Sequence, residues 1–466
     1  MSLLDALLRD SLLNTVVQSD VYIAIRTDGA PGAGTEEDPY NGGKLLPTLD
    51  TDKPPVVLAN ATTFDTLMNA LPAGVTIRLG SGIFCTRGYP ASTGWKPKSG
   101  QRIVGSGMDA TTLLVCNGQA SARTVAIGVD LSTVFLQGFE ASDLTIDCAL
   151  SYSYSGHNAN ASVGGVAVTG THVFLRRIRL KNFGNQGTGV ACYGLSAATA
   201  YQPNHPYNCL IEECLVQEPG GANSNPVVCL HVGSATGTGI LSYHTACAIR
   251  NCWVDCSDAT FTKEYQAISA MFGKGTIVEG NRIYNCKNGG PYYDGTEGDL
   301  PTTVQAVTDL VVRDNYYYNV HFGVFISTNA SSGNVGRVII QKNVFELGQA
   351  TSAPAAVTLF GGNRSSPPGF FAQLILRGNL IRPVDGAAPS ASTLGITLNS
   401  VDEAVVESNV INVATSDKAL SHTVCGSVKP FNNQSSAGVF LPGYDGTAFV
   451  HDAELTTDVQ DVLLEL

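Results

Sequence analysis

One glycine-rich segment, residues 292–299, concentrates the side chains best suited to chemistry. Within it Asp294, Glu297 and Asp299 place three carboxylates within six residues, beside the aromatic rings of Tyr292 and Tyr293. Closely placed carboxyl groups can separate their pKa values and act as acid and base on a glycosidic bond. The apolar face of a tyrosine ring can stack on a sugar. We therefore predict that the three carboxylates are catalytic and that the two tyrosines contact the substrate.

A second group of chemical side chains, Lys263, Glu264 and Tyr265, lies about one repeat earlier in the chain. If the repeats stack, this group neighbours the first, with Glu264 as a further acid or base and Lys263 and Tyr265 as substrate contacts. The alternative for both groups is an unreactive loop. Asp-Gly is a turn signal, and acidic residues on loops are commonly just solvated.

Metal-binding motifs are sparse in this sequence. The eight histidines form no His-x-x-x-His or His-Glu-x-x-His pattern, and the twelve cysteines form no Cys-x-x-Cys pair, so a zinc site is not expected. Asp28, Glu36, Glu37 and Asp38 lie in a glycine-rich loop of the kind that calcium favours, with a plain loop as the alternative. Calcium is the one cofactor left open. Several cysteines fall at apolar positions of the repeat and are expected to be reduced and buried.

These groups need a scaffold, and a repeated sequence pattern predicts one. The pattern is an apolar residue, any residue, an apolar residue, two mostly polar residues, Asn, any residue and an apolar residue. The spacing from one copy to the next varies between 28 and 38 residues, so constant strands alternate with loops of changing length. One such coil cannot bury its apolar face alone, so the coils must stack. We predict an all-β fold, a right-handed parallel β-helix solenoid with short terminal helices, from about residue 75 to about residue 413. The position of the Asn is taken in turn by Leu144, Ile178, Cys214, Cys252, Asn281, Asn315, Asn343, Asn379 and Asn409.

A leucine-rich repeat is the rival architecture, because its consensus also contains apolar, any, apolar, two residues and Asn. Most of the observed spacings exceed the longest usual period of that repeat, about 29 residues. The segments between the strands are rich in Gly, Ser, Thr and Asn without a helical pattern, and the apolar positions favour Val and Ile. The β-helix is therefore preferred.

Three regions follow from the limits of the repeat. Residues 1–60 hold an N-terminal helix, with Leu4, Leu7, Leu8 and Leu12 on one face, and the acidic glycine-rich loop. Residues 61–415 form the parallel β-helix. Residues 416–466 leave the repeat, are interrupted by Pro430 and end in a short acidic helix, so we expect them to cap the solenoid or to form an oligomerisation segment.

Composition limits the class of partner. The chain has 466 residues with 50 glycines, 44% hydrophobic and 14% charged residues, a profile that suits turn-rich β structure. Its net charge of −12 argues against nucleic-acid binding, which relies on clustered Lys and Arg. The one dense basic run, residues 176–181, alternates with Ile and Leu like a strand with outward cations. No stretch of about 20 apolar residues occurs, so membrane insertion is not predicted, and no signal peptide is recognised.

The segment FDTLMNALPAGVTIRLGSGIF, residues 64–84, is similar to the start of pectate-lyase-like β-helices. The segments GTEEDPY, residues 34–40, and IVGSG, residues 103–107, fit the same pattern. In that superfamily a short helix covers the open end of the solenoid, and a strand that ends near a Gly-aromatic turn begins the first coil. The resemblance covers most of the chain as architecture. It implies no single activity, because this fold hosts lyases, hydrolases, epimerases and phage tailspikes.

Local signatures narrow the activity further. Polygalacturonase-type enzymes carry Asn-Thr-Asp, Asp-Asp, Gly-His-Gly and Arg-Ile-Lys segments; residues 177–179 come nearest to the last but lack the lysine, and the other three are absent. The Arg-x-Pro-x-x-Arg segment of calcium-dependent pectate lyases is also missing. The closest functional resemblance is to a tailspike-like or tail-fibre-like protein that is assembled inside a cell.

Three hypotheses on function remain. The first is a surface-polysaccharide-binding β-helix of the tailspike type, with or without glycan cleavage at residues 292–299. Such a protein would be a homotrimer, located on a virion or an extracellular surface after assembly in the cytoplasm. The second is a stand-alone polysaccharide lyase or glycoside hydrolase. The third is a non-catalytic structural β-helix of a particle or cell surface.

Overall fold

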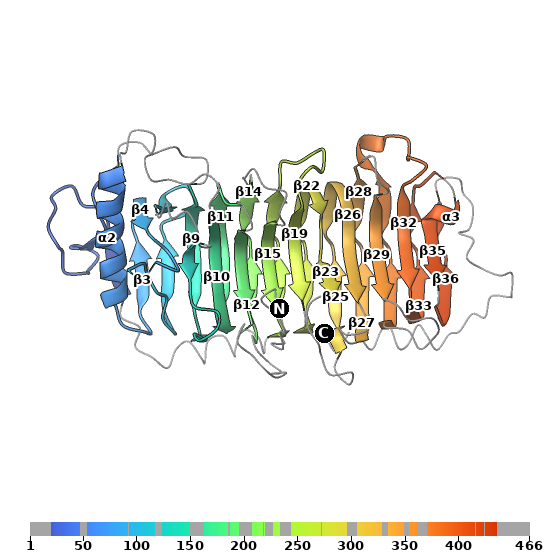
Figure 1. The fold of residues 1–466 in the computed structure, drawn as a ribbon, viewed down its shortest axis with the longest axis horizontal. Helices are drawn as coiled ribbons and strands as arrows, with labels where there is room; N and C mark the ends of the chain where they lie inside the picture. Colours follow the sequence, from blue (N-terminus) through green and yellow to red (C-terminus); the bar gives the residue numbers. More distant parts are fainter. Residues whose placement is uncertain are drawn as a thin grey trace.

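The strands of the chain stack into one elongated solenoid with a helix across its N-terminal end (Figure 1). The computed structural model describes residues 20–46, 54–91, 93–116, 124–149, 163–184, 187–194, 207–217, 219, 227–233, 244–271, 273–295, 305–328, 334–348, 354–361, 371–414, 416–423 and 425–435. Strands of successive coils pair in parallel and in register along its length. The predicted all-β fold, a parallel β-helix, is confirmed.

Each coil contributes strands to three rows, called here sheets 1, 2 and 3. Sheet 1 contains β3 (Thr76–Leu79), β5 (Arg102–Gly105), β9 (Glu140–Asp147), β11 (Phe174–Lys181), β13 (Leu210–Glu212), β17 (Ala248–Arg250), β21 (Ile277–Glu279), β25 (Leu310–Arg313), β27 (Asn334–Gln341), β30 (Phe371–Arg377), β33 (Val401–Glu407) and β36 (Ser427–Phe431). Sheet 2 contains β4 (Gly82–Thr86), β6 (Thr111–Val115), the second halves of β9 and β11, β14 (Leu215–Gln217), β18 (Trp253–Asp255), β22 (Arg282–Asn288), β26 (Tyr316–Thr328), β28 (Val344–Leu347), β31 (Leu380–Pro383), β34 (Val410–Ile411) and β37 (Gln434–Ser435).

Sheet 3 closes the coils on the remaining side. It contains β7 (Thr124–Gly128), β10 (Val163–Thr171), β12 (Thr188–Tyr193), β15 (Val227–Gly233), β19 (Tyr265–Met271), β23 (Tyr292–Gly295), the second half of β26, β29 (Ala355–Gly361), β32 (Leu394–Asn399) and β35 (Leu420–Thr423). The short strands β8 (Leu136–Gln137), β16 (His244–Thr245), β20 (Gly273–Lys274) and β24 (Gln305–Thr308) lead back toward sheet 1.

A sharp corner separates sheet 1 from sheet 2 in each coil. The residue at this corner has a positive φ, the left-handed conformation that Gly, Asn and Asp adopt most easily. Arg, Glu, Lys and Ser also occur there, so the stacking of the coils imposes the conformation on residues that do not favour it. The corner residues are Asp143, Arg177, Glu213, Asn251, Gly280, Asp314, Lys342, Gly378, Ser408 and Asn432.

The buried Asn that follows the corner joins neighbouring coils. The Nδ2 atom of Asn281 donates to the carbonyl oxygen of Ile249 in the preceding coil, at 3.0 Å, and to Oδ1 of Asn315 in the next coil, at 2.9 Å. The same Oδ1 accepts from the backbone N–H of Asn281 at 2.9 Å. The pattern continues without interruption through Asn343, Asn379 and Asn409 to Asn433. The predicted column of asparagines is confirmed and gains one member.

Cysteine takes the same position in two upstream coils. The Cys214 thiol lies 3.6 Å from the carbonyl oxygen of Leu175, and the Cys252 thiol lies 3.9 Å from that of Ile211. In the coils that have Asn at this position, the side-chain amide donates to the carbonyl oxygen at the same place in the preceding coil, as Asn281 does to Ile249. Eleven of the twelve cysteines are buried and all twelve are free thiols, as expected from their apolar positions.

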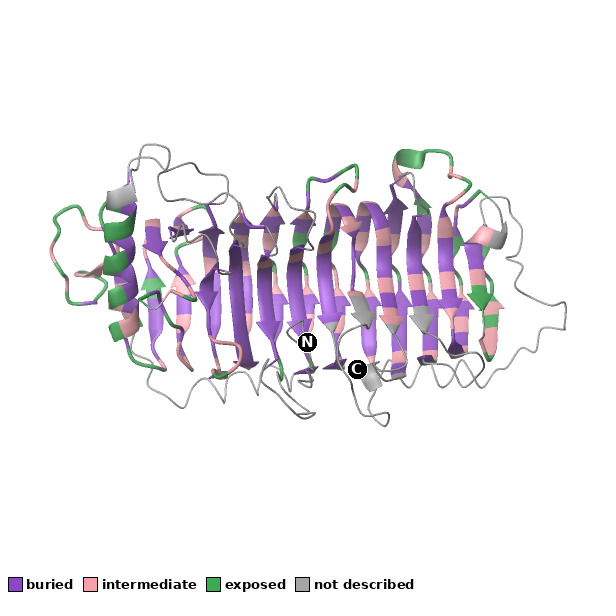
Figure 2. Cartoon of the chain, in the orientation of Figure 1, coloured by how far each residue is buried: buried purple, intermediate pink, exposed green. Residues whose placement is uncertain are grey.

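The core is one continuous column of inward side chains, and solvent reaches mainly the loops and the outer face of α2 (Figure 2). Helix α2 (Pro54–Ala70) covers the N-terminal end, as the resemblance to pectate-lyase-like β-helices implies. Its Phe64 and Met68 are fully buried, and the Phe64 ring packs against Phe84 and Trp95. Within the described residues no helix is long and apolar enough to cross a membrane.

The solenoid is longer at both ends than predicted. Strand β1 (Asp20–Ala24) pairs with β3 and with β2 (Tyr40–Asn41), so coil structure begins before residue 60, and the predicted boundary at residues 60–61 falls inside α2. At the other end a four-residue helix, α3 (Ser416–Ala419), precedes β35, β36 and β37, which form one more coil. Pro430 does not break the repeat, because β36 lies at the edge of sheet 1 within the described chain, where a missing N–H is tolerated. The helices expected near residues 1–17 and 452–466 lie outside the described residues.

Candidate functional site

Sheet 2 carries a run of outward aromatic side chains. Side chains alternate along a strand, so the residue after the buried Asn or Cys points outward, as does the residue two further on. These positions are Trp253 on β18, Tyr284 on β22, and Tyr316 and Tyr318 on β26, in three successive coils. We call these four residues the aromatic stripe. β22 and β26 lie next to one another near the middle of the solenoid (Figure 1).

The rings of the aromatic stripe contact one another across the coils. Trp253 and Tyr284 stack with their centroids 5.1 Å apart and their planes 22° apart. Tyr284 lies 5.7 Å from Tyr318 and 6.0 Å from Tyr316, and the last two lie 6.5 Å apart with planes 28° apart. Trp253 is 43% exposed, well above the exposure usual for so large an apolar side chain. The three tyrosines are partly buried. The stripe is thus an aromatic surface that runs along the solenoid axis and is partly open to solvent.

An open hollow of about 440 Å³ lies beside the stripe. It is lined by Gly280, Asn281, Arg282, Tyr284, Asp314 and Tyr316. Gly280 has a φ of +65°, and a Cβ atom there would lie 2.4 Å from Oδ1 of Asn251, so the glycine keeps the hollow open at the corner. Arg282 and Asp314 are exposed. The hollow therefore offers two aromatic rings, a hydrogen-bond donor group and an acceptor group to one ligand.

Polar contacts fix the far edge of the stripe. The Tyr318 hydroxyl donates to both carboxylate oxygens of Asp385, at 2.9 and 3.0 Å, in the turn η1 (Val384–Gly386). Burial, together with the neighbouring Glu346 carboxylate, raises the pKa of Tyr316 to about 12, and the hydrogen bond to Asp385 raises the pKa of Tyr318. Glu346 is itself paired with Arg382. Both hydroxyls remain protonated at neutral pH, so the rings of Tyr316 and Tyr318 are uncharged.

The described part of the predicted segment, Tyr292–Gly295, forms β23 on sheet 3, apart from the stripe on sheet 2. Tyr292 is partly buried and stacks on Phe325 of the next coil, with ring centroids 5.0 Å apart and planes 13° apart. Tyr293 and Asp294 lie in β23, paired with Ile326 and Ser327 of β26. The side chains of Tyr293 and Asp294, and the whole of Glu297 and Asp299, lie outside the described part of the structure. The catalytic role of the three carboxylates stays a prediction.

The second predicted group occupies the coil before, as expected, and the side chains of Glu264 and Tyr265 have partners within the protein. Glu264 forms an ion pair with Lys287. The Lys263 backbone N–H donates to Asp258 at 2.7 Å. Tyr265 is only 5% exposed, and its hydroxyl donates to the carbonyl oxygen of Pro219 at 2.8 Å. Tyr265 is therefore a core residue, and its position does not suit the substrate contact that we predicted for it.

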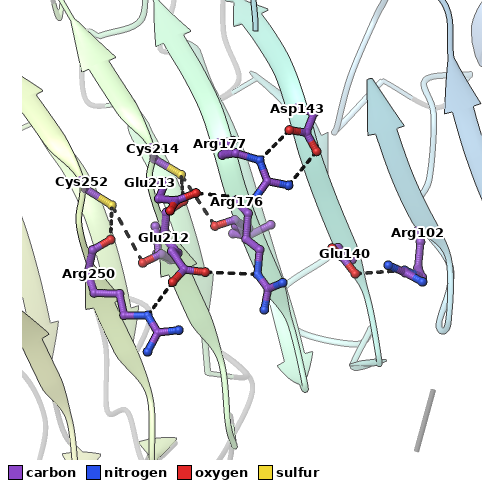
Figure 3. Close-up of polar contacts among 12 residues, drawn as sticks. Arg102, Glu140, Asp143, Arg176, Arg177, Glu212, Glu213, Cys214, Arg250 and Cys252 are labelled. Atoms are coloured by element: carbon purple, nitrogen blue, oxygen red, sulfur yellow. Dashed lines mark hydrogen bonds and ion pairs between the residues drawn. The ribbon is translucent and has the colours of Figure 1, made fainter. Parts of the chain in front are cut away.

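The basic run on β11 forms an ordinary strand. Arg177 donates to Asp143 at 2.6 and 2.8 Å, Arg176 lies 3.5 Å from Glu212, and the same Glu212 accepts from Arg250 at 2.7 Å (Figure 3). The remaining cations of the run are also paired, Arg179 with Asp109 and Lys181 with Asp147. This alternation of charge leaves no cationic patch among the described residues of these coils, and it agrees with the interpretation of the run as a strand with outward cations.

In the acidic leading loop, an arginine already neutralises two of the candidate calcium ligands. Arg26 donates to Asp28 at 2.9 and 2.6 Å and to Asp38 at 2.5 Å. These hydrogen bonds from Arg26 lower the pKa of Asp28 to about 2. No cluster of three metal-ligating side chains occurs among the described residues. Calcium binding stays a prediction without further support.

Comparisons with known proteins concern the fold. No family model matches the chain, and no curated protein sequence matches it. Among solved structures, it is similar to the family 28 exopolygalacturonase of Yersinia enterocolitica, at 11% identity and a TM-score of 0.47, over 89% of this chain and 78% of that chain. It is also similar to the Dettilon tailspike protein, at 13% identity and a TM-score of 0.45, over 93% of this chain and 76% of that chain. A third similar structure is the surface adhesin PfbA of Streptococcus pneumoniae, at 11% identity and a TM-score of 0.45, over 89% of this chain and 90% of that chain.

Proposed function

We propose that the chain is a surface-polysaccharide-binding β-helix of the tailspike type, and that the glycan lies along the aromatic stripe. The single observation that supports this most is the row of four aromatic rings in mutual contact on three successive coils, of which Trp253 is exposed and the three tyrosines are partly exposed. Exposed rings of this kind are unfavourable in water unless a ligand covers them. A sugar ring offers the matching partner, with an apolar face for stacking and hydroxyls for hydrogen bonds.

The spacing of the coils fits a polymer that runs parallel to the solenoid axis. Adjacent strands lie about 4.8 Å apart, comparable to the length of one sugar unit, so successive rings meet successive sugars. Arg282 and Asp314, both exposed beside the hollow, provide a donor and an acceptor for sugar hydroxyls. The described coils are rigid where the stripe lies, because the asparagine column joins them from within. A preformed surface loses little entropy when it binds.

The test is the binding of a panel of bacterial and algal polysaccharides, measured by affinity electrophoresis. Trp253→Ala and Tyr284→Ala should each weaken binding about tenfold, since the contact of one aromatic ring contributes about 1.4 kcal/mol. Tyr207→Ala is the matched control, because Tyr207 is equally exposed, at 43%, but lies away from sheet 2. Binding that is unchanged in both stripe variants, or equally weak in the control, would remove the support for this surface.

Glycan cleavage by Asp294, Glu297, Asp299 and Glu264 belongs to the same proposal as a separate step. Release of reducing ends, or absorbance of unsaturated sugar products, would reveal a hydrolase or a lyase respectively. Asp294→Asn and Glu297→Gln should abolish the release while binding to the stripe persists. Cleavage that survives in both variants would exclude this segment, and binding without cleavage by the unmodified protein would make the chain a recognition protein.

The location and the oligomeric state follow from the tailspike type and are proposed with it. A tailspike-like protein acts on a virion or at an extracellular surface, as a homotrimer. Light scattering on the purified chain gives its mass directly. A mass equal to one chain at micromolar concentration would contradict the trimer and would leave the binding proposal intact.

A further inference from the structure

Thiol groups lie inside the solenoid directly beneath the aromatic stripe. On β18 the side chains of Trp253 and Asp255 point outward, and the next inward residue after Val254 is Cys256, which is buried. In the next coil Tyr284 points outward, and Cys286, two residues on, is buried because Asn285 between them has a φ of +51° and interrupts the alternation. The same pair of strands therefore carries aromatic rings on its outer side and thiols on its inner side.

Cys256 contacts two other thiols. The thiols of Cys209, Cys252 and Cys286 each lie near a backbone carbonyl oxygen, at 3.3 Å. The side-chain contacts of Cys256 are instead with sulfur: its Sγ lies 3.1 Å from Sγ of Cys286 and 3.9 Å from Sγ of Cys229. Its hydrogen bond to Cys286 is thus a direct contact between thiols of neighbouring coils.

The backbone geometry suits a covalent bond between these two sulfurs. Just before them β18 and β22 are paired in parallel, with Val254 opposite Ile283 and Asp255 opposite Tyr284, so Cys256 directly follows the pairing and Cys286 lies one position further along its own strand. Paired strands lie about 4.8 Å apart, within the Cα separation of about 4.4–6.8 Å that disulfides require. The two cysteines are 30 positions apart in the sequence, so the bond would close one complete coil. Constraining the unfolded chain in this way stabilises the folded one.

We propose that Cys256 and Cys286 form a disulfide between neighbouring coils when the folded protein meets a small two-electron oxidant such as hydrogen peroxide. Each thiol loses its proton, the S–S bond forms, and the two electrons break the O–O bond of the peroxide, which takes up the two protons and leaves as two molecules of water. Burial raises the pKa of the Cys256 thiol, so the reaction is slow at neutral pH and quickens as the pH rises. The bond would fix the spacing of the coils beneath Trp253 and Tyr284.

Peptide mapping of the full chain tests this. The reduced protein is treated with hydrogen peroxide while folded, free thiols are alkylated, and digested peptides are identified by mass spectrometry without reduction. The expected product joins the peptides that contain Cys256 and Cys286, with the loss of two hydrogen atoms. The midpoint of thermal unfolding of the oxidised protein should lie a few degrees above that of the reduced protein. Treatment with dithiothreitol should restore the lower value.

Variants give matched controls. Cys286→Ser should abolish the cross-link and its effect on the unfolding midpoint, whereas Cys425→Ser, at the only cysteine that is not fully buried, should retain both. Mapping uses the unmodified chain, so its outcome does not depend on how well a variant folds. A native chain that forms no Cys256–Cys286 peptide, or that links Cys256 to Cys229 instead, would overturn the proposal. So would a midpoint that falls on oxidation. Each outcome is independent of glycan binding.

Discussion

Replacement of one member of the asparagine column is the sharpest test of how the coils hold together. Asn343 lies in the middle of the column and is completely buried. Its Nδ2 atom lies 3.0 Å from three acceptors: the carbonyl oxygens of Val312 and Gln341, and Oδ1 of Asn379. Its Oδ1 accepts from both the backbone and the side-chain nitrogen of Asn315, at 3.0 Å. Asn343→Ala removes these contacts without introducing a clash.

The loss can be estimated from these contacts. The amide has two hydrogens to donate and receives two more, so about four hydrogen bonds are lost, at about 1 kcal/mol each. The N–H of Asn315 is also left buried without its acceptor, which adds to the cost. We therefore expect Asn343→Ala to lower the free energy of unfolding by about 4 kcal/mol. Asn343→Cys should cost less, because Cys252 and Cys214 occupy this position in upstream coils and contact the same kind of carbonyl.

Urea denaturation followed by circular dichroism measures the loss, and hydrogen exchange of β27 and β28 locates it. Coils of a solenoid contact only their neighbours, so exchange should accelerate most in the two strands next to residue 343. Asn412→Ala is the control, because Asn412 lies outside the column and should change the free energy by less than about 0.5 kcal/mol. A loss below about 1 kcal/mol for Asn343→Ala, or exchange that is unchanged beside it, would refute the reasoning.

Three further predictions concern the cap, the hollow and the outer charges. Burial raises the pKa of Asp65 in α2 to about 6, so the folded chain holds this proton more tightly than the unfolded chain. The free energy of unfolding should therefore fall as the pH rises from about 4 to about 6. Asp65→Asn should remove this pH dependence from urea midpoints measured across that range. Gly280→Val should lower the unfolding midpoint and weaken glycan binding, because its φ is +65° and its Cβ would meet Asn251, whereas a substitution without effect on either would show that the hollow is not used. Arg250→Ala should cost no more than about 1 kcal/mol, less at high salt, because its pair with Glu212 is partly exposed; a salt-independent loss above that would contradict it.

The architecture was predictable because one buried position recurs in a fixed local pattern. Asn343 and its equivalents follow the apolar strand at a constant distance, whatever the length of the loops between them, and a buried amide at a corner has few partners other than the next coil. The last coil escaped prediction for two reasons. Asn433 follows Asn409 after only 24 residues, and Pro430 resembles a break in a strand although an edge strand accommodates it.

The candidate site was less accessible to sequence reasoning. The prediction favoured a cluster of carboxylates, because the Asp and Glu residues that acid–base catalysis needs can be recognised when they lie close together in the sequence. The aromatic stripe has no such cluster: Trp253, Tyr284 and Tyr316 are distant in sequence, and only the stacking of the coils brings them together. The signal was nevertheless present, since the position after the buried Asn or Cys points outward in each coil and is Trp253 and Tyr316 in two of them. Tyr265 shows the converse, an aromatic residue in a promising segment that points inward.

Tryptophan fluorescence tests glycan binding at the stripe most directly. The chain contains two tryptophans, of which Trp95 is fully buried and Trp253 is exposed. Acrylamide should quench the emission of Trp253 in the free protein, and a bound polysaccharide should shield it, with no shielding in Trp253→Phe. Saturating glycan that leaves the quenching of Trp253 unchanged would show that the sugar binds elsewhere and would contradict the account.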